Sequence, residues 1–465
     1  MRSIFFAICA FLLVSCKSIS PSPGSGSKFA QIFGHGRHQS LSSMPAAPMG
    51  GQATAMVGKS DLDLAALVNI AFENNPETRR LWHLCRVADA QGKQAQSVFF
   101  PAINIATAAS RVRTEISGGN QTCTTVYNCP SIELNYMLFN FGANVANALA
   151  AHQNLLAANF QYNRSLQTIL YQVQRCYFEL NAALAAAEAN GANLKDATET
   201  FKVCEARLMT GLGDRQTFLQ AKANALQAEY ALEAARAAAE VKRSALARVV
   251  GVHISEDFHI ATGKLPKELT LLDGEVQRII SKALQVRPDL LAMRAQVMAM
   301  EYGEKATRSD LLPKVFLSAS GAITDHGHVG STQTGNVTMG LSWDLFDGNG
   351  RHYKLLEQRE RRKAAMAAYH SAELEVAGDI WSQYHAYRSA FQRVQAAREM
   401  LDAATGAFQA VDASYRNGLS VFSDLLHAQG ALAMARSSLI IAESDFSVSL
   451  AGLAYIAGTI EPFAK

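Results

Sequence analysis

Apolar residues recur with two different periods along this chain of 465 residues. From Leu425 to Leu453 a large apolar residue stands at every seventh position, and mostly small residues follow three positions after each. That spacing predicts a long helix that packs closely against its neighbours. In 336–345 (NVTMGLSWDL) apolar and polar residues alternate, which predicts a strand with one apolar and one polar face. About ten residues is the length that a transmembrane strand needs.

Four segments of the chain are strand candidates. The segment 131–141 (SIELNYMLFNF) is the counterpart of 336–345, and a further strand candidate precedes each of them, at 102–116 and 314–324. Polar segments, 117–130 and 325–335, separate the members of each pair and predict loops. The chain therefore offers four membrane-type strands.

Other marks also repeat, so we expect two equivalent halves. Pro101 and Pro313 lie 212 positions apart, and Gly251 and Gly458 lie 207 apart. Each half is predicted as helix, strand, strand, long helix, turn and helix. The boundaries that we expect are a first repeat at 61–255, a linker at 256–272 and a second repeat at 273–461.

The long helices are predicted from two spans that contain no proline. About 143–210 and 351–416 are free of it. If helical throughout, each would be on the order of 100 Å long. Gly191 is a candidate for a break in the first of them.

Four strands cannot close a barrel, and an open sheet edge is not tolerated in lipid. The smallest single-chain barrels have about eight strands, whereas three copies of this chain would supply about twelve. The fold class that we predict is mixed α and transmembrane β: a homotrimeric β-barrel in outer-membrane lipid, continued by a long α-helical barrel. If the apolar strand faces instead pack on a soluble core, the chain is a lipid-anchored coiled-coil structural protein without a pore.

The N-terminus predicts export. Residues 1–15 have the apolar stretch of a signal peptide, and Leu13-Val14-Ser15-Cys16 resembles the lipobox of bacterial lipoproteins. The resemblance implies acylation of Cys16, and Lys17 after it favours the outer membrane. An ordinary cleaved signal peptide is the alternative. Residues 16–60, rich in Ser, Gly and Pro, are predicted to be a lipid-anchored linker.

Two cysteines stand six positions apart in the first predicted loop. Cys123 and Cys129 lie in GGNQTCTTVYNC, and an exported loop is in an oxidising compartment. We predict a disulfide between them. A pair of metal ligands is the alternative, although no second pair completes such a site.

Composition and motifs exclude several other functions. The 43 basic and 40 acidic residues nearly balance, so no nucleic-acid partner is expected. The sequence contains no P-loop, dinucleotide fingerprint, zinc-protease helix or Gly-x-Ser-x-Gly elbow. His326 and His328 form a close pair without an evident third ligand. We therefore expect no enzyme activity, no cofactor and no metal.

The lipobox, the repeated halves and three local motifs resemble the TolC family of outer-membrane channel proteins. The motifs are ALQVRPDL (283–290), LFDGNG (345–350) and YRNGLSVFSDLLHAQ (415–429). The resemblance implies a trimeric channel that conducts small molecules such as drugs and toxic compounds. Its partners would be a periplasmic adaptor and an inner-membrane pump, which in this family is commonly of the RND type. An exit duct of a type I protein secretion system is the alternative with the same fold.

The resemblance also implies a gate at the periplasmic end. Asp424, six residues after a turn glycine, would line the narrowest ring, with His427 where some members have a second acid. Tyr415 matches a tyrosine that ties neighbouring tips together, and Thr217 is the first-half equivalent of Asp424. The residues that the resemblance places at the adaptor contact are Arg207, Leu208, Gly211, Gly418 and Leu419.

Overall fold

The structure, a computed structural model, describes residues 62–115, 122–253, 260, 276–325 and 330–458, except the side chains of 111–128. These residues all belong to one unit, Ala47–Lys465. The predicted signal peptide, Cys16, the N-terminal linker and the pair His326 and His328 lie outside the described residues.

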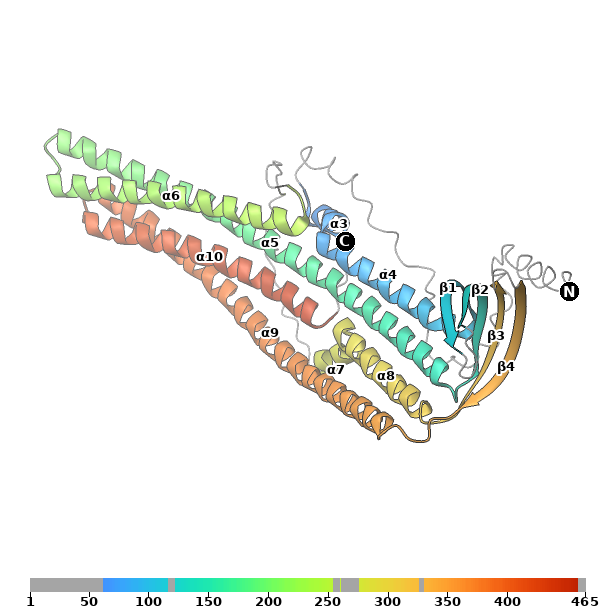
Figure 1. Cartoon of the computed structure of the whole chain (residues 1–465). Helices are drawn as coiled ribbons and strands as arrows, with labels where there is room; N and C mark the ends of the chain where they lie inside the picture. The colour runs from blue at the N-terminus through green and yellow to red at the C-terminus, as the bar shows by residue number, and fades with distance from the viewer. Residues whose placement is uncertain (1–61, 116–121, 254–259, 261–275, 326–329, 459–465) are drawn as a thin grey trace. The chain divides into compact units, whose positions relative to one another are not determined.

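The element order repeats, as the sequence predicts (Figure 1). The first half contains α3 (Leu64–Asn74), α4 (Pro76–Gln96), the short 3-10 helix η3 (Ser97–Phe99), β1 (Ala102–Glu115), β2 (Thr122–Phe139), α5 (Ala143–Met209) and α6 (Arg215–Val250). The second half contains α7 (Val276–Val286), α8 (Pro288–Ser309), β3 (Lys314–Asp325), β4 (Ser331–Ser342), α9 (Gly350–Arg416) and α10 (Phe422–Ile456).

The two long helices have equal length. Helices α5 and α9 each contain 67 residues, so a shift of 207 positions superimposes them without an insertion. The expected break at Gly191 is wrong, because this residue lies inside α5. A glycine costs a helix only about 1 kcal/mol relative to alanine, and packing along a long helix offsets that cost.

The four strands form a single antiparallel sheet in the order β1-β2-β3-β4. Each half supplies one hairpin, and pairing of β2 with β3 joins the halves, with Asn135 opposite Ser318. Strands β1 and β4 are therefore the two edges of the sheet. Each edge presents backbone hydrogen-bonding groups that this sheet does not pair.

The hairpins are longer than the sequence predicts, and this overturns the predicted disulfide. Residues 122–130, expected in a loop, belong to β2, where Cys129 pairs with Ala108 and Cys123 with Thr114. Six positions along one strand separate the two cysteine Cα atoms by about 20 Å, far beyond the reach of a disulfide. Cys129 is a free thiol. The second predicted loop is likewise too long, since β4 begins at Ser331.

The alternating face of β4 is bare in the single chain. Val337, Met339 and Leu341, which share one face, are 74%, 71% and 68% exposed. Strand β4 ends at Ser342, so the alternation continues through Trp343 and Leu345 beyond the last ladder pair. A row of apolar side chains this exposed requires an apolar surrounding.

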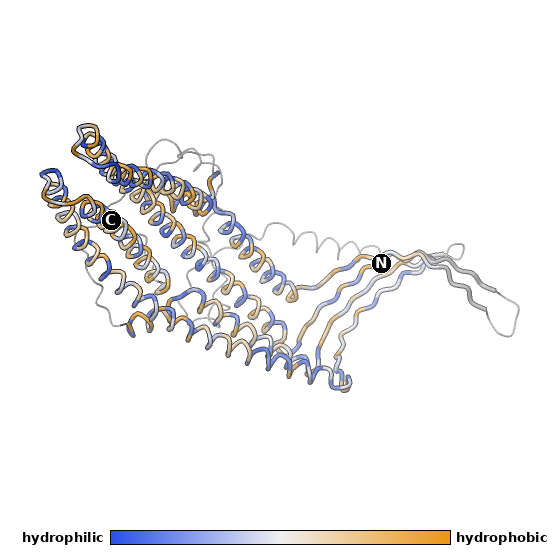
Figure 2. The backbone as a smooth tube through the Cα atoms, turned by 90° about the vertical axis from the view of Figure 1, so that its left-hand side faces the viewer, coloured by the Kyte–Doolittle hydropathy of each residue, from blue (hydrophilic) through white to orange (hydrophobic). Residues whose placement is uncertain are grey.

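The helices pack side by side with apolar seams. Helix α5 contacts α4, α6, α8 and α10, and α9 packs on α7, α8 and α10. Figure 2 shows apolar positions distributed along the whole length of the long helices. On α10 the predicted heptad residues Leu425, Leu432, Phe446 and Leu453 are buried. Among the described helices α10 alone has the length and composition to cross a membrane, but the buried heptad explains its apolar character by packing.

In each half, a side chain at an equivalent position binds the end of the final helix. Asn75 Nδ2 donates to the Val249 carbonyl at 2.9 Å, and Arg287 Nη1 donates to the Ile456 carbonyl at 3.2 Å. The donors are related by 212 positions and the acceptors by 207. In both halves the residue before the helix-starting proline thus binds the last turn of the half's final helix. These contacts satisfy carbonyls that a helix end leaves without partners.

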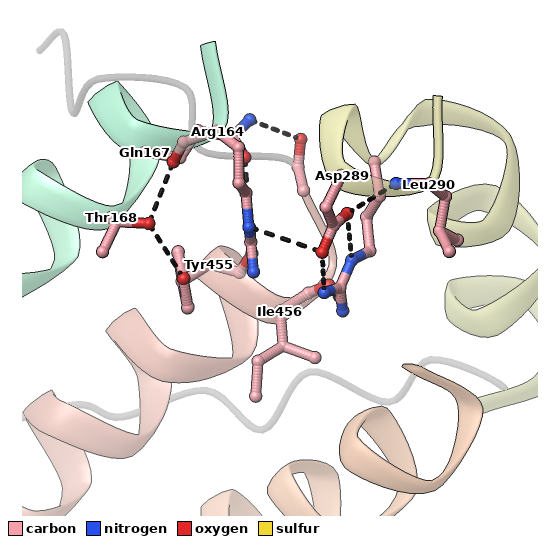
Figure 3. Close-up of polar contacts among 9 residues, drawn as sticks. Arg164, Gln167, Thr168, Asp289, Leu290, Tyr455 and Ile456 are labelled. Carbon is pink, nitrogen blue, oxygen red and sulfur yellow. Dashed lines mark hydrogen bonds and ion pairs between the residues drawn. The ribbon is translucent and has the colours of Figure 1, made fainter. Parts of the chain in front are cut away.

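A charged cluster joins the halves at this level (Figure 3). Asp289 accepts hydrogen bonds from Arg287 Nε at 3.1 Å and Nη2 at 2.5 Å, and lies 3.6 Å from Arg164 Nε on α5. Arg164 Nη1 donates to the Tyr455 carbonyl at 3.2 Å. Burial acts to raise the pKa of Asp289, but the hydrogen bonds from Arg287 and the charges of both arginines outweigh it and lower the pKa.

We predict that Asp289→Asn lowers the unfolding free energy by about 1–2 kcal/mol near neutral pH, because two arginines lose their carboxylate. The side chain is 35% exposed, which keeps the loss at the lower part of the range. Because the pKa of Asp289 is lower in the folded chain than in the unfolded chain, its carboxylate stabilises the fold at pH values above the ordinary pKa of 3.8. This stabilisation is lost as the pH falls through the folded-state pKa. The difference in unfolding free energy between Asp289→Asn and wild type should therefore become smaller in acid.

The measurement is the loss of helical circular dichroism on heating in detergent, followed over a pH series. The matched control is Glu77→Gln. Glu77 is the first-half counterpart of Asp289, and its only ionic partner among the described residues is exposed Arg80, so its replacement should change the melting temperature little. Equal effects of both substitutions, or a gap that does not depend on pH, would contradict the assignment.

Candidate functional site at the helical tips

The two helical hairpins end in turns of the same geometry. Gly211, between α5 and α6, has φ +74°, and Gly418, between α9 and α10, has φ +76°. The next residue in each turn donates its N–H back to the helix: Leu212 to the Arg207 carbonyl at 2.9 Å, and Leu419 to the Ser414 carbonyl at 2.8 Å. Only glycine enters the left-handed region at little cost, which explains its presence at both turns.

The helices that follow the turns are capped differently. Asp214 caps α6 by accepting from the Thr217 N–H at 2.6 Å and from Thr217 Oγ1 at 3.0 Å. The hydrogen bond from this N–H lowers the pKa of Asp214. Helix α10 has Val421 at its N-cap, and Ser420 Oγ donates to the Asp424 carboxylate at 3.1 Å instead. Thr217 is thus bound within its own tip.

Tyr415 joins the two tips inside one chain. Its side chain is 5% exposed and its hydroxyl shares a hydrogen bond with Cys204 Sγ at 3.6 Å. Burial, followed by this contact with Cys204, raises the pKa of Tyr415 to about 12. Arg207 lies 4.6 Å above the ring and donates from Nη2 to the carbonyls of Tyr415 at 3.1 Å and Arg416 at 3.3 Å. An arginine of the first tip therefore holds the helix end of the second.

An apolar core lies beneath this contact. It is formed by Cys204 and Ala221 of the first half with Tyr415, Phe422 and Leu425 of the second. Because both halves contribute, separation of the tips would expose apolar surface and cost free energy. The closed arrangement of the two tips in one chain is therefore stabilised by packing as well as by Arg207.

A polar seam continues the contact away from the tips, between α5 and α10. Arg436 Nη1 donates to Asp196 Oδ2 at 3.1 Å and Asn193 Oδ1 at 2.5 Å. Gln429 Nε2 donates to Thr200 Oγ1 at 2.7 Å. No signal in the sequence marks these residues, because each pair is separated by more than 200 positions and the residue types are not distinctive.

The other predicted site residues face outward. Asp424 and His427 are exposed and lie nearly one turn apart on α10, away from buried Leu425. Leu208 is half-buried, while Gly211, Gly418 and Leu419 are exposed at the turns. The structure thus brings Arg207 and Tyr415 together but does not place Thr217 on Asp424.

Three exposed apolar side chains at the tips were missed by sequence reasoning. Met209 and Leu212 are exposed at the first turn, and Val421 is exposed beside Leu419 at the second. Leu212 is the repeat counterpart of Leu419, so the alignment of the halves contained the signal for it. Among the described residues, no group of three or more His, Cys, Asp or Glu side chains is placed to hold a metal ion.

Comparisons with known proteins agree with this architecture. The family model described as outer membrane efflux protein matches residues 67–252 and 279–459, one segment in each half. The outer membrane efflux protein BepC of Brucella suis is 27% identical over 408 residues, which cover 85% of each chain. The alkaline protease secretion protein AprF of Pseudomonas aeruginosa is 23% identical over 335 residues, 71% of this chain and 69% of AprF.

Solved structures share the fold. The outer membrane channel CmeC of Campylobacter jejuni superimposes with a TM-score of 0.78 at 16% identity, over 86% of this chain and 87% of CmeC. The family model spans most of both halves. The chain therefore belongs to the outer membrane efflux protein family.

Proposed function

We propose that three copies of this chain form one outer-membrane channel, which conducts small molecules delivered by a periplasmic adaptor and an inner-membrane pump. The observation that carries the proposal is the sheet of four strands with two open edges and a bare apolar face on β4. In lipid every backbone polar group must be bonded within protein, so the edges have to pair with other copies. Three copies give about twelve strands, enough for a closed barrel with an open interior.

The internal repeat supports pairing of β4 with β1 of the next copy. Inside the chain β2 of the first half pairs with β3 of the second, with Asn135 opposite Ser318. A shift of 207 positions turns β2 into β4, and a shift of 212 turns β3 into β1. The equivalent pair is then Ser342 with Ala106 of the neighbouring copy. The ring then closes with six junctions of one type, three inside the copies and three between them.

The tips are the proposed gate and adaptor contact. Asp424 and His427 lie on one exposed face of α10, so three copies would present a ring of each near the axis of the trimer. Like charges held close attract cations to such a ring. The exposed apolar residues Met209, Leu212 and Leu419 give an adaptor a surface to bury.

A second function uses the same fold. The name of AprF describes protein secretion, and this relative matches both repeats of the chain. A type I secretion duct would pass an unfolded polypeptide, whereas an efflux channel passes small molecules. Copurification of the crosslinked complex from membranes separates the two, since an RND pump or an ABC transporter would be recovered with the channel.

The first prediction concerns Asp424. Asp424→Ala should lower the cation-to-anion permeability ratio toward unity and weaken block by divalent cations, because three carboxylates leave the constriction. Trimer assembly should not change, since the side chain is exposed and bonds only Ser420 among the described contacts. Planar-bilayer recordings provide the measurement. Asp424→Glu, which keeps the charge, is the control and should behave as wild type; unchanged selectivity in the alanine variant would remove Asp424 from the constriction.

A further prediction concerns the contact between the two tips of one chain. Arg207→Ala removes hydrogen bonds to two carbonyls and the contact with the Tyr415 ring, which together are worth about 1.5–3 kcal/mol. The ratio of closed to open tips should fall roughly tenfold or more, and resting conductance should rise accordingly. Tyr415→Phe removes only the hydroxyl contact with Cys204 and should have a smaller effect.

Single-channel recordings without adaptor measure this ranking. Lys202→Ala is the control, because Lys202 is an exposed cation of the same helix near the tip. If Arg207→Ala stays as closed as the control, the arginine does not hold the tips together.

The third concerns the membrane anchor. Acylation of Cys16 is proposed from the lipobox-like Leu13-Val14-Ser15-Cys16. Mass spectrometry of the mature N-terminus should find an acylated cysteine, and Cys16→Ala should impair maturation more than conductance, since the barrel itself holds the protein in the membrane. A mature chain that begins further along with an unmodified residue would refute it.

A further inference from the structure

The two halves correspond residue by residue along their long helices. Helices α5 and α9 align with a constant shift of 207 positions, and α6 and α10 follow with the same shift. Gly251 with φ +78° and Gly458 with φ +70° end the two hairpins in the same way. Each contact between the halves therefore has a defined counterpart between one copy and the next.

Inside the chain, the end of α10 covers one face of α5 (Figure 3). Tyr455 provides the contact: its hydroxyl shares a hydrogen bond with Thr168 Oγ1 at 3.0 Å, and its ring stacks on Tyr171 at 4.8 Å. The guanidinium of Arg164 lies 3.9 Å above the same ring. The face of α5 that bears these three residues is half-buried as a result.

The equivalent face of α9 is bare. Ser371, Leu374, Glu375 and Gly378 are the counterparts of Arg164, Gln167, Thr168 and Tyr171, and all four are exposed in the single chain. On α6 the counterpart of Tyr455 is Arg248, which is also exposed in the last turn. In the described part of the chain, neither the Arg248 nor the Glu375 side chain forms a hydrogen bond or an ion pair.

We propose that neighbouring copies join by repeating the contact between the halves, so that Arg248 of one copy pairs with Glu375 of the next. The inference rests on the proposed closure of several copies into one channel and names the residues that make it. The shift converts the neutral pair Tyr455 and Thr168 into an arginine and a glutamate. Opposite charges thus face each other at this position between copies, whereas the same position inside the chain holds a neutral pair.

Side-chain size agrees with this arrangement. Inside the chain, the small residues Ala292 and Ala295 of α8 pack against the larger Phe160 of α5. At the equivalent positions the sizes are reversed. The counterparts of the two alanines on α4 are the larger Arg80 and His83, and the counterpart of Phe160 on α9 is the smaller Ala367. A junction with large α4 side chains on a small α9 face keeps the pairing of large with small side chains that the internal junction has.

The outer face of α6 also fits a partner. Leu226, Tyr230 and Val241 are exposed apolar residues of α6 in the single chain. The counterparts of Leu226 and Val241 on α10 are Ala433 and Val448, which are half-buried, whereas Ser437, the counterpart of Tyr230, is exposed. Leu226 and Val241 are therefore expected to be covered by the next copy, alongside the ion pair.

Charge reversal tests the pair in the full-length protein purified from membranes. Glu375→Arg and Arg248→Glu should each cause a loss of trimer in mild detergent, because like charges then face each other across the junction. The double variant restores opposite charges and should recover the trimer. Asp379→Arg is the matched control: Asp379 is an exposed acid one turn further along α9, and its counterpart Gln172 is exposed and outside the internal contact.

Crosslinking gives a second readout that does not depend on stability. Chains with Arg248→Cys and chains with Glu375→Cys, produced together, should form dimers with a short bifunctional thiol reagent. The internal counterpart, Thr168→Cys with Tyr455→Cys in one chain, should react without any increase in mass. Of the native free thiols, Cys85 and Cys204 are buried, whereas Cys129 and Cys176 are only partly buried. Both these residues and Cys123 are therefore replaced by serine in all crosslinking variants.

The outcomes separate the inference from the proposed function. If wild type forms conducting trimers but the reversals do not weaken them, or the double variant fails to recover, the ion pair is refuted and the channel stands. If wild type does not associate in membranes, both are refuted. Loss in both single variants, recovery in the double variant and an intermolecular crosslink together establish the pair.

Discussion

Backbone hydrogen bonding at the two edges of the sheet governs the assembly of this protein. Strands β1 and β4 each have one side without a partner in the chain, and the face of β4 exposes a row of apolar side chains. In water such a sheet would aggregate, and in lipid its open edges would be far more costly. A ring of several copies removes both edges at once and leaves the apolar face to the membrane. The long helices α5 and α9 are the next elements after β2 and β4, so each extends from the sheet.

The repeat makes this closure simple to encode. The junction between the halves is built inside every chain, through β2 with β3 and α5 with α8 and α10. A ring needs a second junction between copies, and the duplicated sequence supplies surfaces of the same shape for it. The two junctions differ in chemistry. Inside the chain, Arg164, Arg287 and Asp289 form a half-buried charged cluster, whereas the equivalents of Arg164 and Asp289 are Ser371 and exposed Glu77. A chain whose two outer surfaces must bind other copies, and not each other, requires internal and external junctions that differ in this way.

Local features of the sequence were sufficient to predict the repeated halves, the four strands and the length of α9. The halves follow from marks that recur at fixed offsets, the strands from local alternation and their repeat counterparts, and the helix length from the absence of proline. The extent of the hairpins was not predictable in this way, because Thr122–Pro130 is rich in polar residues and reads as a loop although it pairs with β1. A strand whose two faces are both polar lacks the alternation that identifies strands. The disulfide prediction failed for the same reason.

The tip was predicted in part. The turn glycines, Tyr415 and Arg207 were found, since the repeat and the family motif mark them. Their mutual contact was not, because it joins residues 208 positions apart and depends on how the two hairpins pack. Cys204 had no signal in the sequence: a single buried cysteine in a helix is normally a small apolar residue. Its hydrogen bond to Tyr415 became visible only in the structure.

The central claim is that β4 of one copy pairs with β1 of the next in the register of β2 with β3. A chain carrying both Ser342→Cys and Ala106→Cys, oxidised in the outer membrane, tests it most directly, because directly opposed residues of neighbouring strands lie within reach of a disulfide. The expected product contains three chains before reduction, and reducing agent converts it to single chains. Oxidised protein that runs only as single chains, from membranes in which it is inserted, would contradict it.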